Sequence, residues 1–256
     1  MSGLTVGVIG GMGPAATVQF LARLQALTPA ARDEDHLRLL VDCNPHIPDR
    51  NAAARGEGPS PGPVLAAMAR GLERAGAQVL VMPCNTAHAD ASAITSACEA
   101  PFIDLIETAR DETMALTPRR VGILAADGCI AAGLYQRAFA AAGVAVVLPE
   151  PAAQAQFMAL LYRIKAGDTG EAVRAGMRAV AAGLIAAGAD VVLAGCTEIP
   201  LVLGQADVAA PLVDSLDALA RRTVVVARGE LPAQFESPPP SAPFPGFAGT
   251  SPTGGR

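Results

Sequence analysis

Two copies of one segment decide the fold: AGAQVLVMPCNT at residues 75–86 and AGADVVLAGCTE at residues 187–198. Each copy reads as the end of a helix, then a strand, then a polar turn headed by a cysteine. A second pair of strands, at residues 6–10 and 121–125, agrees at a nearly equal offset. The chain is therefore predicted to contain two similar α/β halves, with one cysteine at the carboxyl end of an equivalent strand in each half.

The two cysteines of the repeat, Cys84 and Cys196, are the first candidates for chemistry. A pseudo-twofold axis would relate their thiols, and such a pair can act on opposite faces of one substrate. Backbone N–H groups in the turns that follow are expected to lower both thiol pKa values below the ordinary value of roughly 8.5. A lone cysteine in an apolar stretch is usually buried filler, which is the interpretation of Cys43 and Cys98. Cys129 is interpreted as a non-catalytic residue that borders the site.

Composition indicates a globular enzyme of the cytoplasm. The 256 residues are 51% hydrophobic and 17% charged, enough for one large core or two cores of roughly 100 residues each. A net charge of −5 without a basic run argues against nucleic acid and anionic membranes as partners. No secretory signal opens the chain, and no apolar run reaches the ~18 residues that span a bilayer. Five cysteines without metal-ligand spacing fit a reducing compartment, so neither disulfides nor a metal site is expected.

Short runs rich in Val, Ile and Leu alternate with Ala-rich helical stretches, which is typical of mainly parallel sheets covered by helices on both faces. The expected strands are 4–9, 37–42, 78–82, 101–105, 121–125, 144–148, 190–194 and 211–213, and the expected helices are 14–27, 62–75, 88–98, 106–116, 131–142, 152–165, 169–187 and 215–228. The fold class is α/β, with two Rossmann-like (flavodoxin-like) domains. Residues 1–104 and 210–230 are assigned to the first domain and 105–209 to the second. The Pro-, Gly- and Ser-rich residues 231–256 are expected to form a disordered tail.

The glycine turn GGMGP at residues 10–14 follows a strand and opens a helix, where nucleotide-binding loops also occur. Its spacing matches neither G-x-G-x-x-G nor a P-loop, which argues against a nucleotide. It is predicted to be a tight turn whose free amide groups face a small anion, with a purely structural turn as the alternative.

Four motifs carry a resemblance to a known family: GGMGP at 10–14, IPDR at 47–50, PCNTAH at 83–88 and GCTE at 195–198. Over residues 4–228, in this order, the chain resembles the aspartate racemase branch of the aspartate/glutamate (hydantoin) racemase superfamily. The resemblance implies two similar α/β domains, an active site in the cleft between them, a reaction without pyridoxal phosphate or metal, and a homodimer. It also implies that Cys84 and Cys196 are the proton-transferring pair.

Two cations are candidates for holding substrate carboxylates. Arg50 ends the IPDR turn, where its planar guanidinium can form a bidentate pair with a carboxylate. Lys165 is the only lysine of the chain, with a chance surface position as the alternative interpretation. The resemblance assigns both to substrate binding, and a small dicarboxylic amino acid would use both. The other predicted substrate-binding residues are Met12, Asn85, Thr86 and Thr197.

Two neighbours of the cysteines are assigned a supporting role with a structural alternative. His88 lies one helical turn after Cys84 and either tunes that thiol or serves as a capping or packing residue. Glu198 either polarises the thiol of Cys196 or satisfies the start of a helix.

The chain departs from the family at AADGC, residues 125–129, where the family usually carries two hydroxyl residues three positions apart. Ala126, Asp127 and Cys129 therefore change the site, and the carboxylate of Asp127 would repel an acidic substrate.

The predicted function is the interconversion of L- and D-aspartate, with glutamate or a wider range of amino acids left open. Racemisation removes the α-proton from one face and returns a proton to the other, so it needs a base and an acid on opposite sides of the carbon. One alternative is a hydantoin racemase, maleate isomerase or malonate decarboxylase of the same superfamily. The other is a two-domain protein that binds a small ligand without catalysis.

Overall fold

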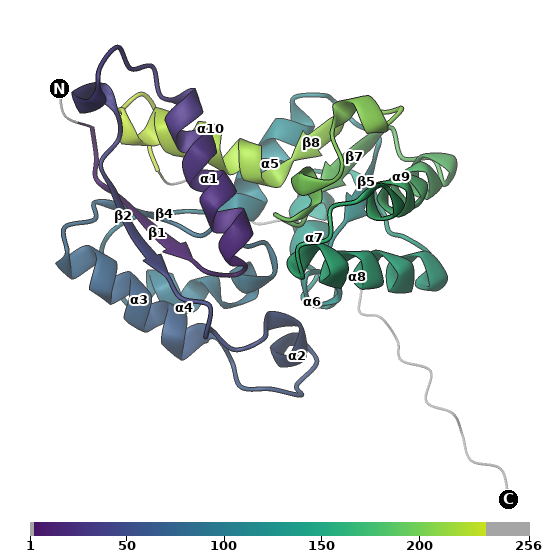
Figure 1. Cartoon of the computed structure of the whole chain (residues 1–256), viewed down its shortest axis with the longest axis horizontal. Helices are drawn as coiled ribbons and strands as arrows, with labels where there is room; N and C mark the ends of the chain where they lie inside the picture. Colours follow the sequence, from purple (N-terminus) through teal and green to yellow (C-terminus); the bar gives the residue numbers. More distant parts are fainter. Residues whose placement is uncertain (1–2, 234–256) are drawn as a thin grey trace, which may run out of the picture.

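The computed structural model describes residues 3–233, which form two four-stranded sheets in which every pairing is parallel (Figure 1). The strands of the first sheet are β1 (Val6–Gly10), β2 (Leu39–Cys43), β3 (Val79–Val81) and β4 (Phe102–Ile103), and those of the second are β5 (Arg120–Leu124), β6 (Ala145–Val147), β7 (Val191–Ala194) and β8 (Leu212–Asp214). The strand order is β2-β1-β3-β4 in the first and β6-β5-β7-β8 in the second, so the two halves repeat one topology. This confirms the predicted pair of similar α/β units.

Ten α-helices connect these strands within residues 3–233. They are α1 (Pro14–Leu27), α2 (Arg50–Ala54), α3 (Gly62–Arg74), α4 (Ala91–Thr95), α5 (Leu105–Met114), α6 (Asp127–Ala131), α7 (Leu134–Ala141), α8 (Pro151–Lys165), α9 (Glu171–Ala186) and α10 (Ser215–Ala227). Short 3₁₀ turns occur at η1 (Asp33–Asp35), η2 (Thr86–Asp90), η3 (Ile199–Leu201) and η4 (Gln205–Asp207). Helices α3 and α4 cover one face of the first sheet, α1 and α10 cover the other, and α8 and α9 cover the outer face of the second (Figure 1).

The repeated AGA triplet marks the same helix ending in both halves. Gly76, after α3, has φ 101°, and Gly188, after α9, has φ 94°, a left-handed conformation that glycine adopts without steric cost. In each copy the alanine that follows donates its N–H to a carbonyl of the preceding helix, at 3.0 Å. The triplet therefore turns the chain directly from a helix into the central strand that leads to a cysteine.

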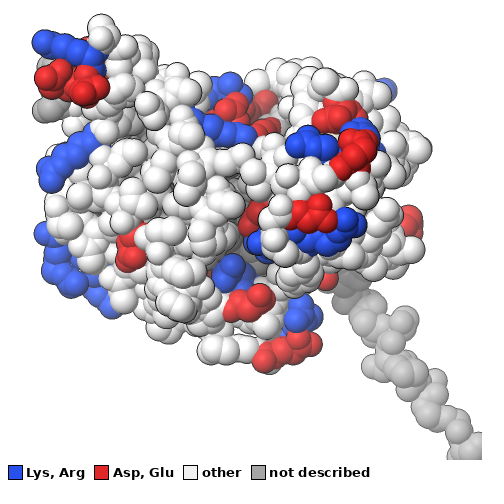
Figure 2. Space-filling view, viewed as in Figure 1, with Lys and Arg blue, Asp and Glu red and all other residues white. Residues whose placement is uncertain are grey.

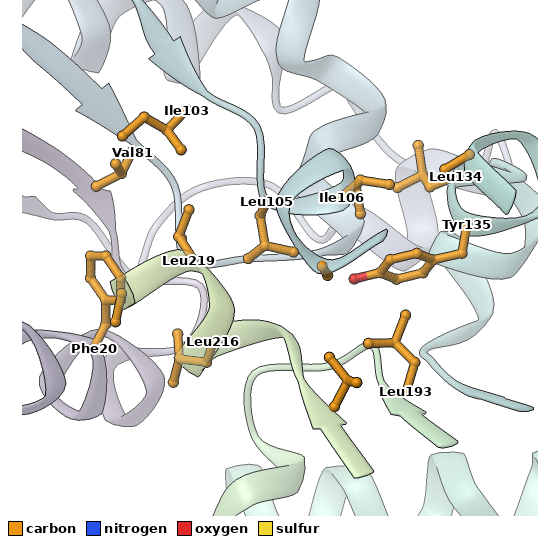
Figure 3. Close-up of a cluster of buried hydrophobic side chains, with 14 of the residues drawn as sticks. Phe20, Val81, Ile103, Leu105, Ile106, Leu134, Tyr135, Leu193, Leu216 and Leu219 are labelled. Atoms are coloured by element: carbon orange, nitrogen blue, oxygen red, sulfur yellow. The ribbon is translucent and has the colours of Figure 1, made fainter. Parts of the chain in front are cut away.

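One apolar core joins the two halves. It is built from inward-facing residues of both sheets together with α1, α5, α7 and α10. Figure 3 shows Phe20 and Leu219 on the side of the first sheet, Leu105 of α5 in the middle, and Tyr135 and Leu193 on the side of the second sheet. Because this core is continuous, the strand ends of one half are held in a fixed place relative to those of the other.

The return of the chain to the first half begins with α10. Strand β8 pairs with β7 in the second sheet, whereas the predicted division gave residues 210–230 as a whole to the first domain. Helix α10 packs against α1 of the first half and also against α5, which the predicted division gave to the second domain. The division into domains itself stays a prediction. Most of the predicted tail, residues 234–256, lies outside the described residues.

Candidate functional site

A pocket lies where the two sheets present their carboxyl ends to each other. Met12 follows β1, Cys84 follows β3, Ala126 follows β5 and Cys196 follows β7, and all four residues line it. The cavity measures about 70 Å³, well below the roughly 300–1,000 Å³ of pockets for drug-sized ligands, so its size limits a ligand to a small molecule. Figure 2 shows a hollow between the two halves on this face, with both basic and acidic side chains around it.

The pocket brings together both predicted cysteines and all six predicted substrate-binding residues. From the predicted set, the lining residues are Met12, Arg50, Cys84, Asn85, Thr86, Lys165, Cys196, Thr197 and Glu198. His88 is the one member of the predicted set that does not line it.

Cys84 sits in a buried turn between β3 and η2. Burial raises the pKa of its thiol, and the charge of Glu198 adds to this, while Arg50, the backbone N–H of Ala87 and Lys165 act in the opposite direction. The surroundings of Cys84 therefore include two cations and one amide donor that favour its thiolate form.

Cys196 occupies the equivalent turn after β7, but the charged group nearest to it is a carboxylate, which favours the neutral thiol over the thiolate. Its Sγ donates to Oε2 of Glu198 at 3.1 Å. Burial raises the pKa of Cys196 well above its ordinary value, and the negative charge of Glu198 raises it further, against the effect of Lys165. The sequence-based expectation of lowered thiol pKa values is thus wrong for both cysteines, because burial outweighs the amide groups of the short turns.

Glu198 is the buried anion of the site. Its side chain is 4% exposed and forms an ion pair with Lys165 Nζ, while the hydroxyl of Thr197 donates to Oε2 at 3.3 Å. Gly13 of the glycine turn donates its N–H to Oε1 at 3.3 Å. The turn therefore does face an anion, and that anion belongs to the protein. The amide of Gly11 is not free, because it donates to Oγ1 of Thr17 at 2.9 Å.

Arg50 enters the pocket from the start of α2. The helix is capped by Asp49, whose carboxylate accepts the N–H of Ala52 at 2.8 Å. Nη1 of Arg50 donates to the carbonyls of Ile47 at 3.1 Å and Pro48 at 3.0 Å. These two bonds fix the guanidinium plane and leave its other N–H groups for a ligand.

Lys165 ends α8 and is partly exposed. Burial works to lower its pKa, but the negative charge and hydrogen bond of Glu198, together with the charge that Cys196 and Cys84 carry in their thiolate forms, outweigh that effect, so the pKa is raised. Lys165 therefore stays charged, and its charge is balanced by Glu198 in the ligand-free structure.

His88 has a structural position. Leu105, the first residue of α5, donates its N–H to Nε2 at 3.0 Å, so Nδ1 carries the proton and donates to the carbonyl of Cys84 at 2.8 Å. The ring also packs against Phe102. Of the two interpretations offered by the sequence, these contacts favour packing: His88 ties the Cys84 turn to the start of α5.

The departures from the family pattern fall into three different environments. Ala126 lines the pocket and gives it an apolar wall. Asp127 does not line it, and Nε2 of Gln154 donates a hydrogen bond to its Oδ1 at 2.7 Å. Cys129 is buried, and burial raises its pKa to about 12, so its thiol stays protonated at neutral pH. The structure therefore does not place the carboxylate of Asp127 against a ligand in the pocket, where it was expected to repel an acidic substrate.

Four lining residues were not predicted from the sequence: Asp49, Asn51, Leu161 and Tyr162. Asp49 and Asn51 flank Arg50, and Oδ1 of Asn51 accepts the N–H of Gly128 at 2.9 Å, which joins α2 to α6. Leu161 and Tyr162 lie on the last turn of α8 beside Lys165. Because a helix over residues 152–165 was predicted, the residues three and four positions before Lys165 could have been expected to lie beside it on the same face.

Two negative findings concern residues 3–233. This part of the chain holds no group of three or more His, Cys, Asp or Glu side chains placed to bind a metal ion. None of its helices combines the length and the hydrophobicity needed to cross a membrane.

A duplicated parallel α/β fold with a cysteine from each half in one shared pocket defines the class of protein. The sequence model of the Asp/Glu/hydantoin racemase family matches residues 9–223. The chain belongs to this family, as the resemblance of its motifs indicated.

Individual relatives agree with this assignment. The broad specificity amino-acid racemase RacX of Bacillus subtilis (strain 168) is 26% identical over 228 residues, covering 86% of this chain and 96% of the relative. The structure of Picrophilus torridus aspartate racemase superimposes with a TM-score of 0.80 at 29% identity, covering 89% of this chain and 95% of the other. An aspartate racemase homologue from Pyrococcus horikoshii OT3 shares the fold, with a TM-score of 0.71 at 22% identity, 89% coverage of this chain and 99% of the other.

Proposed function

We propose that the protein is a cofactor-independent racemase that interconverts L- and D-aspartate with Cys84 and Cys196 as the two proton-transferring groups. The observation that carries the proposal is one thiol from each half in a single pocket that also holds Arg50 and Lys165. The racemase family and the similarity to an aspartate racemase support it.

The unequal surroundings of the thiols suit the two roles that racemisation requires. Arg50 and the N–H of Ala87 favour the thiolate of Cys84. The carboxylate of Glu198 instead accepts a hydrogen bond from the thiol of Cys196 and favours its protonated form. In the proposed reaction the Cys84 thiolate removes the α-proton of one enantiomer and Cys196 delivers its proton to the opposite face. The other enantiomer reacts in the reverse direction, from a state in which Cys196 is the thiolate.

The carbanion that forms between these steps needs stabilisation, because the α-hydrogen of an amino acid is only weakly acidic. Its charge spreads into the α-carboxylate, which cations and N–H donors of the pocket can hold. Arg50 offers N–H groups for one carboxylate. Lys165 offers a cation for the second carboxylate of a dicarboxylic substrate, in competition with Glu198. Each carboxylate of aspartate or glutamate would therefore have one cation to pair with, in a pocket whose lining also contains the carboxylates of Asp49 and Glu198.

A wider substrate range is the second candidate. Ala126 and Leu161 give the pocket apolar surface, and the relative from B. subtilis is a racemase of broad specificity. A homodimer and a cytoplasmic location stay predictions.

The deciding experiment is proton NMR in deuterium oxide with dialysed protein and no added pyridoxal phosphate or metal. L-Aspartate and L-glutamate should lose the α-proton signal and yield the D-enantiomer, with higher specificity constants than alanine, serine and asparagine. Activity that disappears on dialysis and returns with pyridoxal phosphate would refute a cofactor-independent reaction. Binding of amino acids without any exchange would instead support the non-catalytic alternative.

The raised thiol pKa values predict an alkaline pH dependence. Since the pKa of Cys84 lies above its ordinary value, only a small fraction is thiolate at pH 7, and that fraction grows roughly tenfold per pH unit below the pKa. The specificity constant for aspartate should therefore rise between pH 6.5 and 8.5 and fall only when Cys196 also loses its proton. A profile of kcat/KM against pH tests this, and a decrease over that interval would contradict the assignment of Cys84 as the base.

A further inference from the structure

A chain of buried hydrogen bonds runs behind the pocket and links the two cysteine turns. The hydroxyl of Tyr135, on α7, donates to Oδ1 of Asn85, the residue after Cys84. Nδ2 of Asn85 donates to Oγ of Ser215 at 3.2 Å, and Ser215 donates to the carbonyl of Ala194 at 2.8 Å. All four residues are buried, and Ala194 ends the strand that leads to Cys196.

The last acceptor in this series of hydrogen bonds determines which group donates in each of the others. The carbonyl of Ala194 can only accept, so it takes the single hydroxyl hydrogen of Ser215. The oxygen of Ser215 must then accept, which places the NH₂ group of Asn85 toward Ser215 and its carbonyl oxygen toward Tyr135. Burial raises the pKa of Tyr135 well above its ordinary value, so its hydroxyl keeps the hydrogen that it donates. The network therefore permits one orientation of the Asn85 amide.

The second hydrogen on Nδ2 of Asn85 is left for a ligand. Within residues 3–233, the only hydrogen bond that this nitrogen donates is the one to Ser215, and Asn85 lines the pocket. If the amide were flipped, it would present an oxygen to the pocket and repel a carboxylate. With the amide held, it presents an N–H, a donor whose bond strengthens as charge develops on the substrate in the transition state.

We propose that Tyr135 is a positioning residue that holds the Asn85 amide with its free N–H toward the substrate carboxylate. The proposal rests on the proposed function, because it takes an amino-acid carboxylate as the ligand. Tyr135 does not line the pocket; its hydroxyl donates to Asn85 and also lies within hydrogen-bonding reach of Ser215, the other anchor of the same amide.

A second contact of Tyr135 explains its place in the fold. A Cβ atom added to Gly195 would lie 2.8 Å from Cε2 of Tyr135, so the ring passes closely under the residue before Cys196. Figure 3 shows the ring beside Leu193 of β7, with its hydroxyl oxygen pointing inward between the two halves. One side chain thus contacts both cysteine motifs, with its ring against Gly195 and its hydroxyl on Asn85. The two contacts can be separated by mutation, since phenylalanine keeps the ring and loses the hydroxyl.

The test is a double-mutant cycle with Tyr135→Phe and Asn85→Ala. Tyr135→Phe alone should lower kcat/KM for aspartate roughly 10- to 100-fold, somewhat less than removal of a whole transition-state donor. In the Asn85→Ala background the same change should have no further effect, because no amide remains to be oriented. Thr223→Val is the matched control: it removes a fully buried hydroxyl bonded to the carbonyl of Leu219 at 2.7 Å and should leave kcat/KM unchanged.

Two results would overturn the proposal. One is a kcat/KM of Tyr135→Phe equal to that of the wild-type protein. The other is an equal loss of kcat/KM when Tyr135→Phe is made in the wild-type protein and in Asn85→Ala, which would show that the hydroxyl matters for packing alone. If Tyr135→Phe fails to fold by circular dichroism, Ser215→Ala removes the other anchor of the amide and takes its place in the cycle.

Failure of the proposed function has a separate signature, because it would appear as absent deuterium exchange in the wild-type protein. The same cycle is then measured on the dissociation constant of L-aspartate by calorimetry. Non-additive losses of affinity would uphold the role of Tyr135 in holding Asn85 toward a carboxylate. Additive losses, or no binding by the wild-type protein, would overturn it.

Discussion

Replacement of either Cys84 or Cys196 by serine is expected to lower racemisation by roughly 10²- to 10⁴-fold in both directions. A serine hydroxyl ionises far less readily than a thiol, and both positions are buried, which disfavours an ionised oxygen further. Each direction of the reaction uses one group as base and the other as acid, so neither variant can retain a complete pathway. Initial rates from L- and from D-aspartate, followed by circular dichroism, measure the effect.

The two variants should also differ from each other. Cys84→Ser removes a group whose thiolate form is favoured by Arg50 and the Ala87 amide. Cys196→Ser removes a thiol that donates a hydrogen bond to Glu198. Deuterium exchange without inversion, followed separately for each enantiomer, would show which single proton transfer survives. Near wild-type turnover in either variant would exclude the two-thiol mechanism.

The other cysteines provide matched controls for these substitutions. Cys43 is exposed, so its interpretation as buried filler was wrong, Cys98 is partly buried, and neither lines the pocket. Cys43→Ser and Cys98→Ser should therefore alter stability more than catalysis. A large loss of activity in either control would indicate a general effect of serine substitution on the fold.

Most of the fold could be predicted from the sequence because its signals are local. Val-, Ile- and Leu-rich runs predicted every strand, and the repeated AGA triplets revealed the duplication that the two sheets confirm. Helices α2 and α6 were missed because each has only five residues, too few to show a helical period, whereas the equally short α4 directly follows the 3₁₀ turn η2 and fell within the predicted helix 88–98. Membership of β8 in the second sheet depends on pairing with β7 and could not be deduced from its own residues.

The candidate site could be predicted only in part. Cys84 and Cys196 were predicted to act on one substrate because the internal repeat relates their thiols by a pseudo-twofold axis, and the family resemblance implied a site in the cleft between the two domains. The contacts that orient the site depend on tertiary structure: Tyr135 and Ser215 lie 50 and 130 positions from Asn85. The direction of the thiol pKa shifts was predicted wrongly for the same reason, because burial is known only once the core is assembled.

The pairing of Lys165 with Glu198 is the contact with the largest consequence for substrate choice. Both residues were candidates from the sequence, but the ion pair shows that one of the two pocket cations is balanced before a ligand binds. Arg50 instead donates to backbone carbonyls, which carry no net charge. The ligand-free pocket therefore offers one cation that forms no ion pair within residues 3–233, although the carboxylate of Asp49 also lines the pocket, and one cation that a substrate must share with Glu198.

Arg50→Ala and Lys165→Ala are each expected to cost about 2–5 kcal/mol of transition-state stabilisation for aspartate, which is roughly a 30- to 5,000-fold loss in kcat/KM. Arg50→Ala removes the cation that holds a carboxylate and favours the Cys84 thiolate. Lys165→Ala leaves the buried Glu198 unpaired beside Cys196, so its loss includes that penalty. The double variant should lose less than the sum of the two, because both cations orient one substrate.

The substrate panel makes this prediction specific for dicarboxylates. For alanine or asparagine, which have no second carboxylate, one of the two substitutions should cost much less than it does for aspartate. Arg163→Ala is the control on α8, because Arg163 is exposed and pairs with the exposed Asp168, an interaction worth about 0–1 kcal/mol that does not reach the pocket. A clear preference of the wild-type protein for a neutral amino acid would refute the dicarboxylate assignment. In that case Lys165 would serve only to balance Glu198, and Arg50 alone would hold the α-carboxylate.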